Sequence, residues 1–176
     1  MQFHLVRAAV PFAALLLGSS LLYLFGLIKF DSPGVDTGLV LLMTVVKVAC
    51  FLFATLHWIQ QTVSSPFHRR YLMSFLVLQV LLIVLSFALD YYYLYQINAA
   101  AFHLPADRKS HAELLLTFLY FSLGKYTTAG VGDIHPTSPA AQICAMGEMV
   151  VSYFTTVLLI ANVSYLQALF SRKAEE

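Results

Sequence analysis

The sequence has few charged residues and lacks the composition of a water-soluble domain. Lys, Arg, Asp and Glu make up 11% of the 176 residues, whereas a soluble globular domain has roughly 25%. The formal net charge is +1, which excludes the concentrated basic face of a nucleic-acid-binding protein. Hydrophobic residues account for 60% of the chain, so no sizeable aqueous domain is expected.

Cysteines and catalytic motifs are also scarce. Only Cys50 and Cys144 are present, and both lie within apolar segments. These positions argue against a disulfide framework and against a metal site with paired cysteine ligands. The sequence has no His-Glu-x-x-His motif, nucleophile elbow or phosphate-binding glycine loop, so we do not expect an enzyme.

Long apolar runs are what the sequence has in abundance. A run of about 20 residues crosses the hydrocarbon core of a bilayer. The segment 111–126 is apolar but too short to cross, which suits a re-entrant helix shielded by protein. The sequence predicts an all-α membrane protein with this re-entrant helix and four transmembrane helices, at about 5–28, 38–62, 70–97 and 139–170.

Basic residues predict the orientation of the spans. Arg69–Arg70 and Arg172–Lys173 lie on one side if the last two spans cross in opposite directions, and that side is expected to be cytoplasmic. Both termini are then cytoplasmic, in a cell membrane and most simply a bacterial inner membrane. Residues 98–110 are external. Tyr91–Tyr93 and Tyr95, near the outer end of their span, are predicted to be interfacial anchors.

The most informative segment is Thr128–Gly132, which reads Thr-Ala-Gly-Val-Gly. A cation that crosses a membrane exchanges its water shell for other oxygens, and rings of backbone carbonyls can supply them. Successive carbonyls reach one axis only through backbone conformations that strain a side chain, so Gly130 and Gly132 have a physical reason. Thr128 would add a ring of hydroxyls below the carbonyls.

From about Tyr71 onward the chain resembles the pore domain of potassium channels, most closely the prokaryotic channels with two helices per pore unit. Thr127–Asp133 stands where that family has Thr-Thr-Val-Gly-Tyr-Gly-Asp, and the match extends to Tyr120–Ser122 and to Pro136. The resemblance implies an N-terminal helical hairpin and a pore domain. Their boundaries are 1–66 for the hairpin and 67–176 for the pore domain, with outer helix 70–97, pore helix 111–127, filter 128–132 and inner helix 139–170.

The resemblance also implies roles for individual residues. The permeant ion is K+, bound at Thr128, Ala129, Gly130 and Val131, and no organic cofactor is expected. The outer mouth carries Asp133 and His135, and Phe121, Lys125 and Glu148 lie behind the filter. The inner helix carries a gating hinge at Ser152 and a pore-lining stripe of Thr156, Ile160, Ser164 and Ala168.

Three departures from the family pattern bear on selectivity. Val131 replaces the usual tyrosine, and Phe121 replaces an aromatic residue that often offers an indole hydrogen bond. Ala129 replaces valine and removes packing volume. A weakly selective Na+/K+ channel is therefore an alternative to a potassium channel. Lys125 is a further departure, and it could interact with the negative carboxyl end of its helix, pair with Glu148, or extend to the outer water.

Two charges lie within predicted spans, Lys47 and Asp90. Buried charges are costly in a membrane, and at about 1.5 Å per residue the two lie at similar depth. We hypothesise that they pair, with separate contacts to backbone or water as the alternative. His103, His111 and His135 are external in this topology. Protonation of His135 could inhibit conduction, although a solvated loop histidine is the simpler interpretation.

One filter segment cannot encircle an ion, and the sequence has no internal repeat that supplies three more. A homotetramer in membrane lipid is therefore expected, without nucleic acid. The spans before the pore carry no regular arginine series, so voltage sensing is not expected. A regulatory subunit of unknown identity could control opening, and a non-conducting scaffold or regulatory subunit with a pore-like fold is the remaining alternative.

Overall fold

A computed structural model describes residues 33–64, 72–105, 110–130 and 132–161. The predicted first span at about 5–28 lies outside these residues. In chain order the elements are helix α2 (Pro33–Ser64), helix α4 (Leu72–Ile97), 3-10 helix η1 (Ala99–Ala101), strand β1 (Phe102–His103), helix α5 (His111–Tyr126), strand β2 (His135–Pro136) and helix α6 (Pro139–Ala161).

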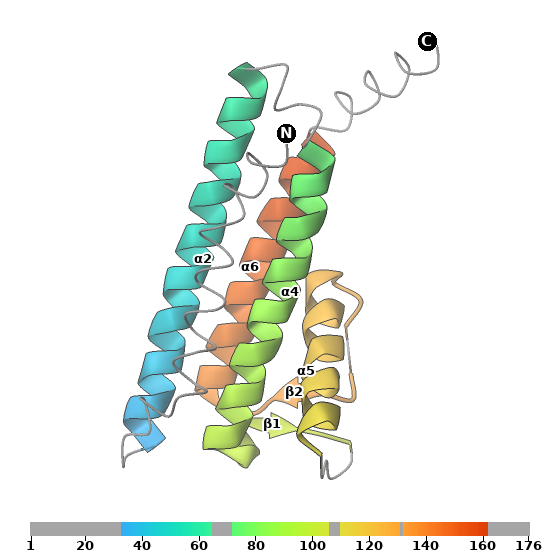
Figure 1. The fold of residues 1–176 in the computed structure, drawn as a ribbon. Helices are drawn as coiled ribbons and strands as arrows, with labels where there is room; N and C mark the ends of the chain where they lie inside the picture. The colour runs from blue at the N-terminus through green and yellow to red at the C-terminus, as the bar shows by residue number, and fades with distance from the viewer. Residues whose placement is uncertain (1–32, 65–71, 106–109, 131, 162–176) are drawn as a thin grey trace.

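Helices α2, α4 and α6 lie side by side, and α4 runs in the opposite direction to the other two (Figure 1). Each contains a stretch that is long and apolar enough to cross a membrane, at Gly34–His57, Val77–Ile97 and Pro139–Leu158. The prediction of an all-helical membrane protein is confirmed for the part of the chain that the structure describes.

The helix boundaries differ from the predicted ones mainly at the start of α2. We expected this span to begin at about residue 38, but α2 already begins at Pro33, because proline is well accommodated in the first turn of a helix. It ends at Ser64, as the nearby Pro66 predicts. Helix α6 begins at Pro139 as predicted and is described to Ala161. The rest of the predicted inner helix lies outside the described residues.

Helix α5 has the course expected of a re-entrant segment. It runs from the end of the bundle that carries β1 and β2 to about the middle, and the chain then returns to the same end before α6 begins (Figure 1). Strands β1 and β2 pair in antiparallel register, with Phe102 opposite Pro136 and His103 opposite His135. This ribbon joins the segment before α5 to the segment after the predicted filter.

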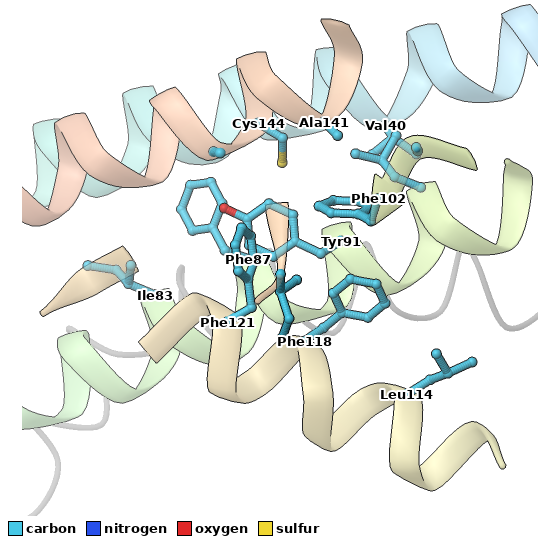
Figure 2. Close-up of a cluster of buried hydrophobic side chains, with 14 of the residues drawn as sticks. Val40, Ile83, Phe87, Tyr91, Phe102, Leu114, Phe118, Phe121, Ala141 and Cys144 are labelled. Atoms are coloured by element: carbon cyan, nitrogen blue, oxygen red, sulfur yellow. The ribbon is translucent and has the colours of Figure 1, made fainter. Parts of the chain in front are cut away.

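Aromatic side chains fill the space between α4 and α5 (Figure 2). Tyr91 is completely buried, and its ring lies edge-on to Phe121 at 5.0 Å and to Phe102 at 5.6 Å between centroids. Phe118 completes the group, 5.0 Å from Phe102. The prediction that Tyr91 is an interfacial anchor is therefore wrong, because α5 and the ribbon cover this face of α4.

Gly147 allows α6 to pack closely against α2. A Cβ atom at this position would lie 3.3 Å from Val48 Cγ2 and 3.7 Å from Thr44 Cγ2. Gly147→Leu is expected to push the two helices apart and to lower the free energy of unfolding by about 1–3 kcal/mol. Thermal unfolding in detergent measures the loss. The control is Gly38→Leu on α2, where an added Cβ meets nothing within 4 Å. An equal loss in both variants contradicts this prediction.

Candidate functional site

The predicted filter begins where α5 ends, in a helix C-terminal motif. The Thr128 amide donates to the Lys125 carbonyl at 3.2 Å, and the Ala129 amide donates to the Gly124 carbonyl at 3.1 Å. This pair of bonds is the Schellman pattern, which places the residue after the cap in the left-handed region. Thr128 occupies that position, with φ of 57°.

A threonine in this conformation is unusual, because the left-handed region costs a residue with a Cβ roughly 1–2 kcal/mol. The Thr128 hydroxyl donates to the Thr127 carbonyl at 2.7 Å, and the two amide bonds hold the backbone in place. Sequence reasoning expected strain at the glycines and did not expect it at Thr128. The local sequence gives no signal for it, because the left-handed residue after a helix is usually glycine.

Gly130 has φ of 71°, so the predicted need for glycine is met at this position. Thr128, Ala129, Gly130 and Gly132 are all exposed. An added Cβ at Gly130 or Gly132 would meet nothing within 4 Å. Val131 lies outside the described residues. The described part of the loop is thus uncovered by its own chain and accessible to an ion or to another copy.

A buried carboxylate lies where α4, α5 and α6 meet. Glu148 on α6 is completely buried, and the Tyr91 hydroxyl donates to its Oε2 at 2.5 Å. The Ser122 hydroxyl on α5 lies 2.5 Å from Glu148 Oε1 and 2.9 Å from the Val84 carbonyl. Side chains from α4, α5 and α6 therefore meet at one hydrogen-bonded cluster, which we call the Glu148 cluster (Tyr91, Ser122, Glu148).

The polar contacts between α4, α5 and α6 at this place come from the Glu148 cluster. Phe121 cannot supply them, because its side chain has no polar atom. Phe121 is completely buried and packs against Tyr91. The Ser122 hydroxyl has one hydrogen, so it donates to Glu148 or to Val84 at any one time. Glu148 was predicted to lie behind the filter. Its partners Tyr91 and Ser122 were missed, and the signal for Tyr91 was its position beside the intramembrane Asp90.

A second buried polar group joins α2 to this region. Lys47 Nζ lies 2.5 Å from Asp90 Oδ1, and both side chains are buried. The Thr44 hydroxyl donates to Asp90 Oδ2 at 3.0 Å. The predicted Lys47–Asp90 pair is therefore present. Asp90 directly precedes Tyr91 in α4. The ion pair and the Glu148 cluster are therefore linked through consecutive residues of one helix.

Lys125 does not pair with Glu148 in the structure. Its Nζ lies 5.1 Å from the centroid of the Phe121 ring, a cation–π distance, and the side chain is half-buried. Lys125 thus covers the aromatic cluster from the carboxyl end of α5.

The predicted inner-helix residues have different environments. Ser152 is buried, donates to the Glu148 carbonyl at 2.7 Å, and lies within a continuous helix. Thr156 and Ile160 are exposed. The side chains of Tyr126 and Thr156 are hydrogen-bonded. Ser164 and Ala168 lie outside the described residues.

The exposed side chains form a face of α6 at helical spacing, here called the α6 stripe: Met146, Val150, Tyr153, Val157 and Ile160.

The two predicted outer-mouth residues follow the predicted filter, and the second of them lies in β2. Asp133 is exposed, Ile134 is 2% exposed, and His135 is exposed again. His135 was interpreted as a loop residue, but it belongs to β2 and its ring stacks on that of His103. The buried Ile134 fixes the backbone between the two polar residues.

The chain is similar to a known protein family. A family model described as ion channel matches residues 79–167, half of the chain. The matched range holds most of α4, all of α5 and α6, and the predicted filter loop. No curated protein and no solved structure matches the chain.

Proposed function

The chain belongs to the ion channel family, and from that membership we propose that four copies form a potassium-selective channel. The observation that carries the proposal is the exposed loop at the end of α5, with Gly130 at φ 71°. A glycine in this conformation lets the backbone turn its carbonyl toward a shared axis. K+ then binds at Thr128, Ala129, Gly130 and Val131 and moves down its electrochemical gradient.

Fourfold assembly follows from the need to surround the ion. Each chain contributes one loop, so a closed ring of identical chains supplies the others. The α6 stripe supports this assembly, because Tyr153 is 71% exposed and Ile160 is 63% exposed in the single chain. The opposite face of α6 already contacts α2 and α4 through buried residues such as Cys144 and Val151.

The proposed preference for potassium rests on the resemblance of Thr127–Asp133 to the potassium channel filter. Helix α5 supports cation binding in general and not the choice of K+ over Na+, because the negative end of its dipole lies at the start of the filter loop. We further propose that the protein lies in a bacterial inner membrane with both termini in the cytoplasm. Membrane lipid surrounds the tetramer, and no nucleic acid takes part.

Flux from purified protein in liposomes tests the proposal. We expect potassium to pass with a clear preference over sodium, and we expect the purified particle to have the mass of four chains. Equal flux of the two ions identifies the weakly selective channel instead. A tetramer that passes neither ion identifies a non-conducting subunit, and a monomeric particle contradicts the proposed pore.

Gly130→Ala is expected to abolish potassium flux and to leave the tetramer intact. The added methyl group has open space, but φ of 71° is unfavourable for any residue with a Cβ, so the loss comes from the backbone alone. Liposome flux measures the effect, and size-exclusion chromatography verifies assembly. Gly38→Ala is the control, because a Cβ at that position also meets nothing within 4 Å. Normal flux in Gly130→Ala contradicts the assigned filter.

A further inference from the structure

Two histidines face each other across the short ribbon at the predicted outer mouth. His103 on β1 is paired directly with His135 on β2, and the ring centroids are 4.8 Å apart with an angle of 30° between the rings. Both side chains are exposed. The ribbon thus presents two imidazoles at one place, although they come from opposite sides of α5 and the filter in the sequence.

The backbone beneath both rings is firmly held. Phe102, next to His103, is 4% exposed, and Ile134, next to His135, is 2% exposed. The Thr137 amide donates to the Ala101 carbonyl at 2.9 Å, which continues the pairing beyond β2. The Cα positions of the two histidines are therefore fixed, while their exposed rings remain able to rotate.

We propose that His103 and His135 form a binding site for a divalent transition metal ion of the Cu²⁺, Ni²⁺ or Zn²⁺ class. Imidazole nitrogen is a preferred ligand of these ions. Directly opposed residues in an antiparallel pair have Cβ atoms about 4.5–5.5 Å apart. From that separation two rotating rings can each direct one nitrogen to a shared ion at about 2.0–2.1 Å.

The site holds the ion with two protein ligands and water. The described residues contain no group of three or more His, Cys, Asp and Glu side chains suited to a metal, so water completes the coordination. Such an exposed, two-ligand site exchanges its ion readily, which suits a regulatory ion rather than a structural one. Hard ions such as Mg²⁺ and Ca²⁺ prefer oxygen ligands and are not expected to bind at this pair.

A metal ion at this position would act on conduction, and this consequence rests on the proposed function. His135 lies two residues after Asp133 and three after Gly132 in the sequence. A bound dication there adds positive charge next to the exit of the filter and opposes the arrival of K+. External metal is therefore expected to reduce potassium flux, and a chelator is expected to restore it.

Isothermal titration of tag-free, full-length protein with NiCl2, ZnCl2 or CuCl2 at neutral pH tests the site. We expect one ion per chain at this pair. His103→Gln and His135→Gln should each weaken binding by more than about tenfold, since even the loss of an outer partner of a metal ligand costs about 10–100-fold. The double variant measures background binding by the other histidines. His111→Gln is the control, because His111 is bonded to Tyr92 and is expected to leave the affinity unchanged.

Two results overturn the site: His103→Gln that binds as tightly as the wild type, or electron paramagnetic resonance of the Cu²⁺ complex that shows one coordinated imidazole nitrogen in place of two. Flux measured with external ZnCl2 tests the consequence separately. If ZnCl2 inhibits the wild type but not His103→Gln, the expected effect of metal on conduction is supported. If potassium flux is undiminished while the site is occupied, that effect is contradicted. If the protein binds the metal but conducts no potassium even in metal-free buffer, the proposed function is refuted and the metal site is not.

Discussion

Tyr91→Phe is expected to lower the potassium-to-sodium permeability ratio by roughly tenfold, which corresponds to about 1.4 kcal/mol. The change removes one hydroxyl and leaves the ring in its aromatic cluster. Glu148 then loses the donor at 2.5 Å, and an unsatisfied buried polar group costs about 1–3 kcal/mol. The cluster can relieve that cost by moving α5 relative to α6, and the filter loop follows α5. Reversal potentials under opposed ion gradients measure the ratio.

Tyr95→Phe is the matched control for this prediction. Tyr95 lies on the same helix and packs against Phe118 of the same aromatic cluster. The tyrosine that donates to Glu148 is Tyr91. Glu148→Gln should be mild, because an amide can still accept from Tyr91 and donate to Ser122. Glu148→Leu should match or exceed Tyr91→Phe. Equal permeability ratios in Tyr91→Phe and Tyr95→Phe would remove the basis for assigning filter support to the cluster.

Lys47→Met and Asp90→Leu, made singly, are each expected to destabilise the folded protein by about 3–5 kcal/mol. Each change leaves the opposite charge buried without its partner, since the side chains of Lys47 and Asp90 are only 2% and 0% exposed. The double variant Lys47→Met/Asp90→Leu should recover most of the loss, because a buried ion pair can be replaced by apolar side chains at little net cost. Thr44 retains an acceptor in that variant, the Val40 carbonyl at 2.9 Å.

Unfolding in detergent with increasing denaturant measures these three variants. A double variant whose loss equals the sum of the two single losses would show that the charges are not coupled. Reversal potentials of whichever variants conduct give a second result. If Asp90 positions Tyr91, the single charge removals should also lower the potassium preference, and the double variant should lower it less.

The features that could be predicted from the sequence are those governed by composition and by backbone chemistry. The three described spans followed from apolar length, and the left-handed backbone at Gly130 followed from the needs of a carbonyl-lined path. The Lys47–Asp90 pair followed from the cost of an unpaired charge at similar depth in neighbouring helices. Each inference depended on a physical cost that is large and local.

The missed features depend on contacts between distant segments. Tyr91 was grouped with the other tyrosines because nothing in its local sequence shows that α5 and the ribbon cover it. Strands β1 and β2 have two residues each, too few for an alternating pattern. Thr128 takes a left-handed conformation through amide bonds to the previous turn of α5, which a preference for glycine does not predict.

The buried pair between α2 and α4 has a consequence for how the chain enters the membrane. Lys47 leaves the ribosome 43 residues before Asp90, so α2 is synthesised before the carboxylate that neutralises it exists. An uncompensated lysine near the middle of a span opposes release into lipid by about 2.5–3.5 kcal/mol on translocon scales. Helix α2 is therefore expected to remain beside the insertion machinery until α4 arrives, so that the two helices enter the bilayer together as one unit.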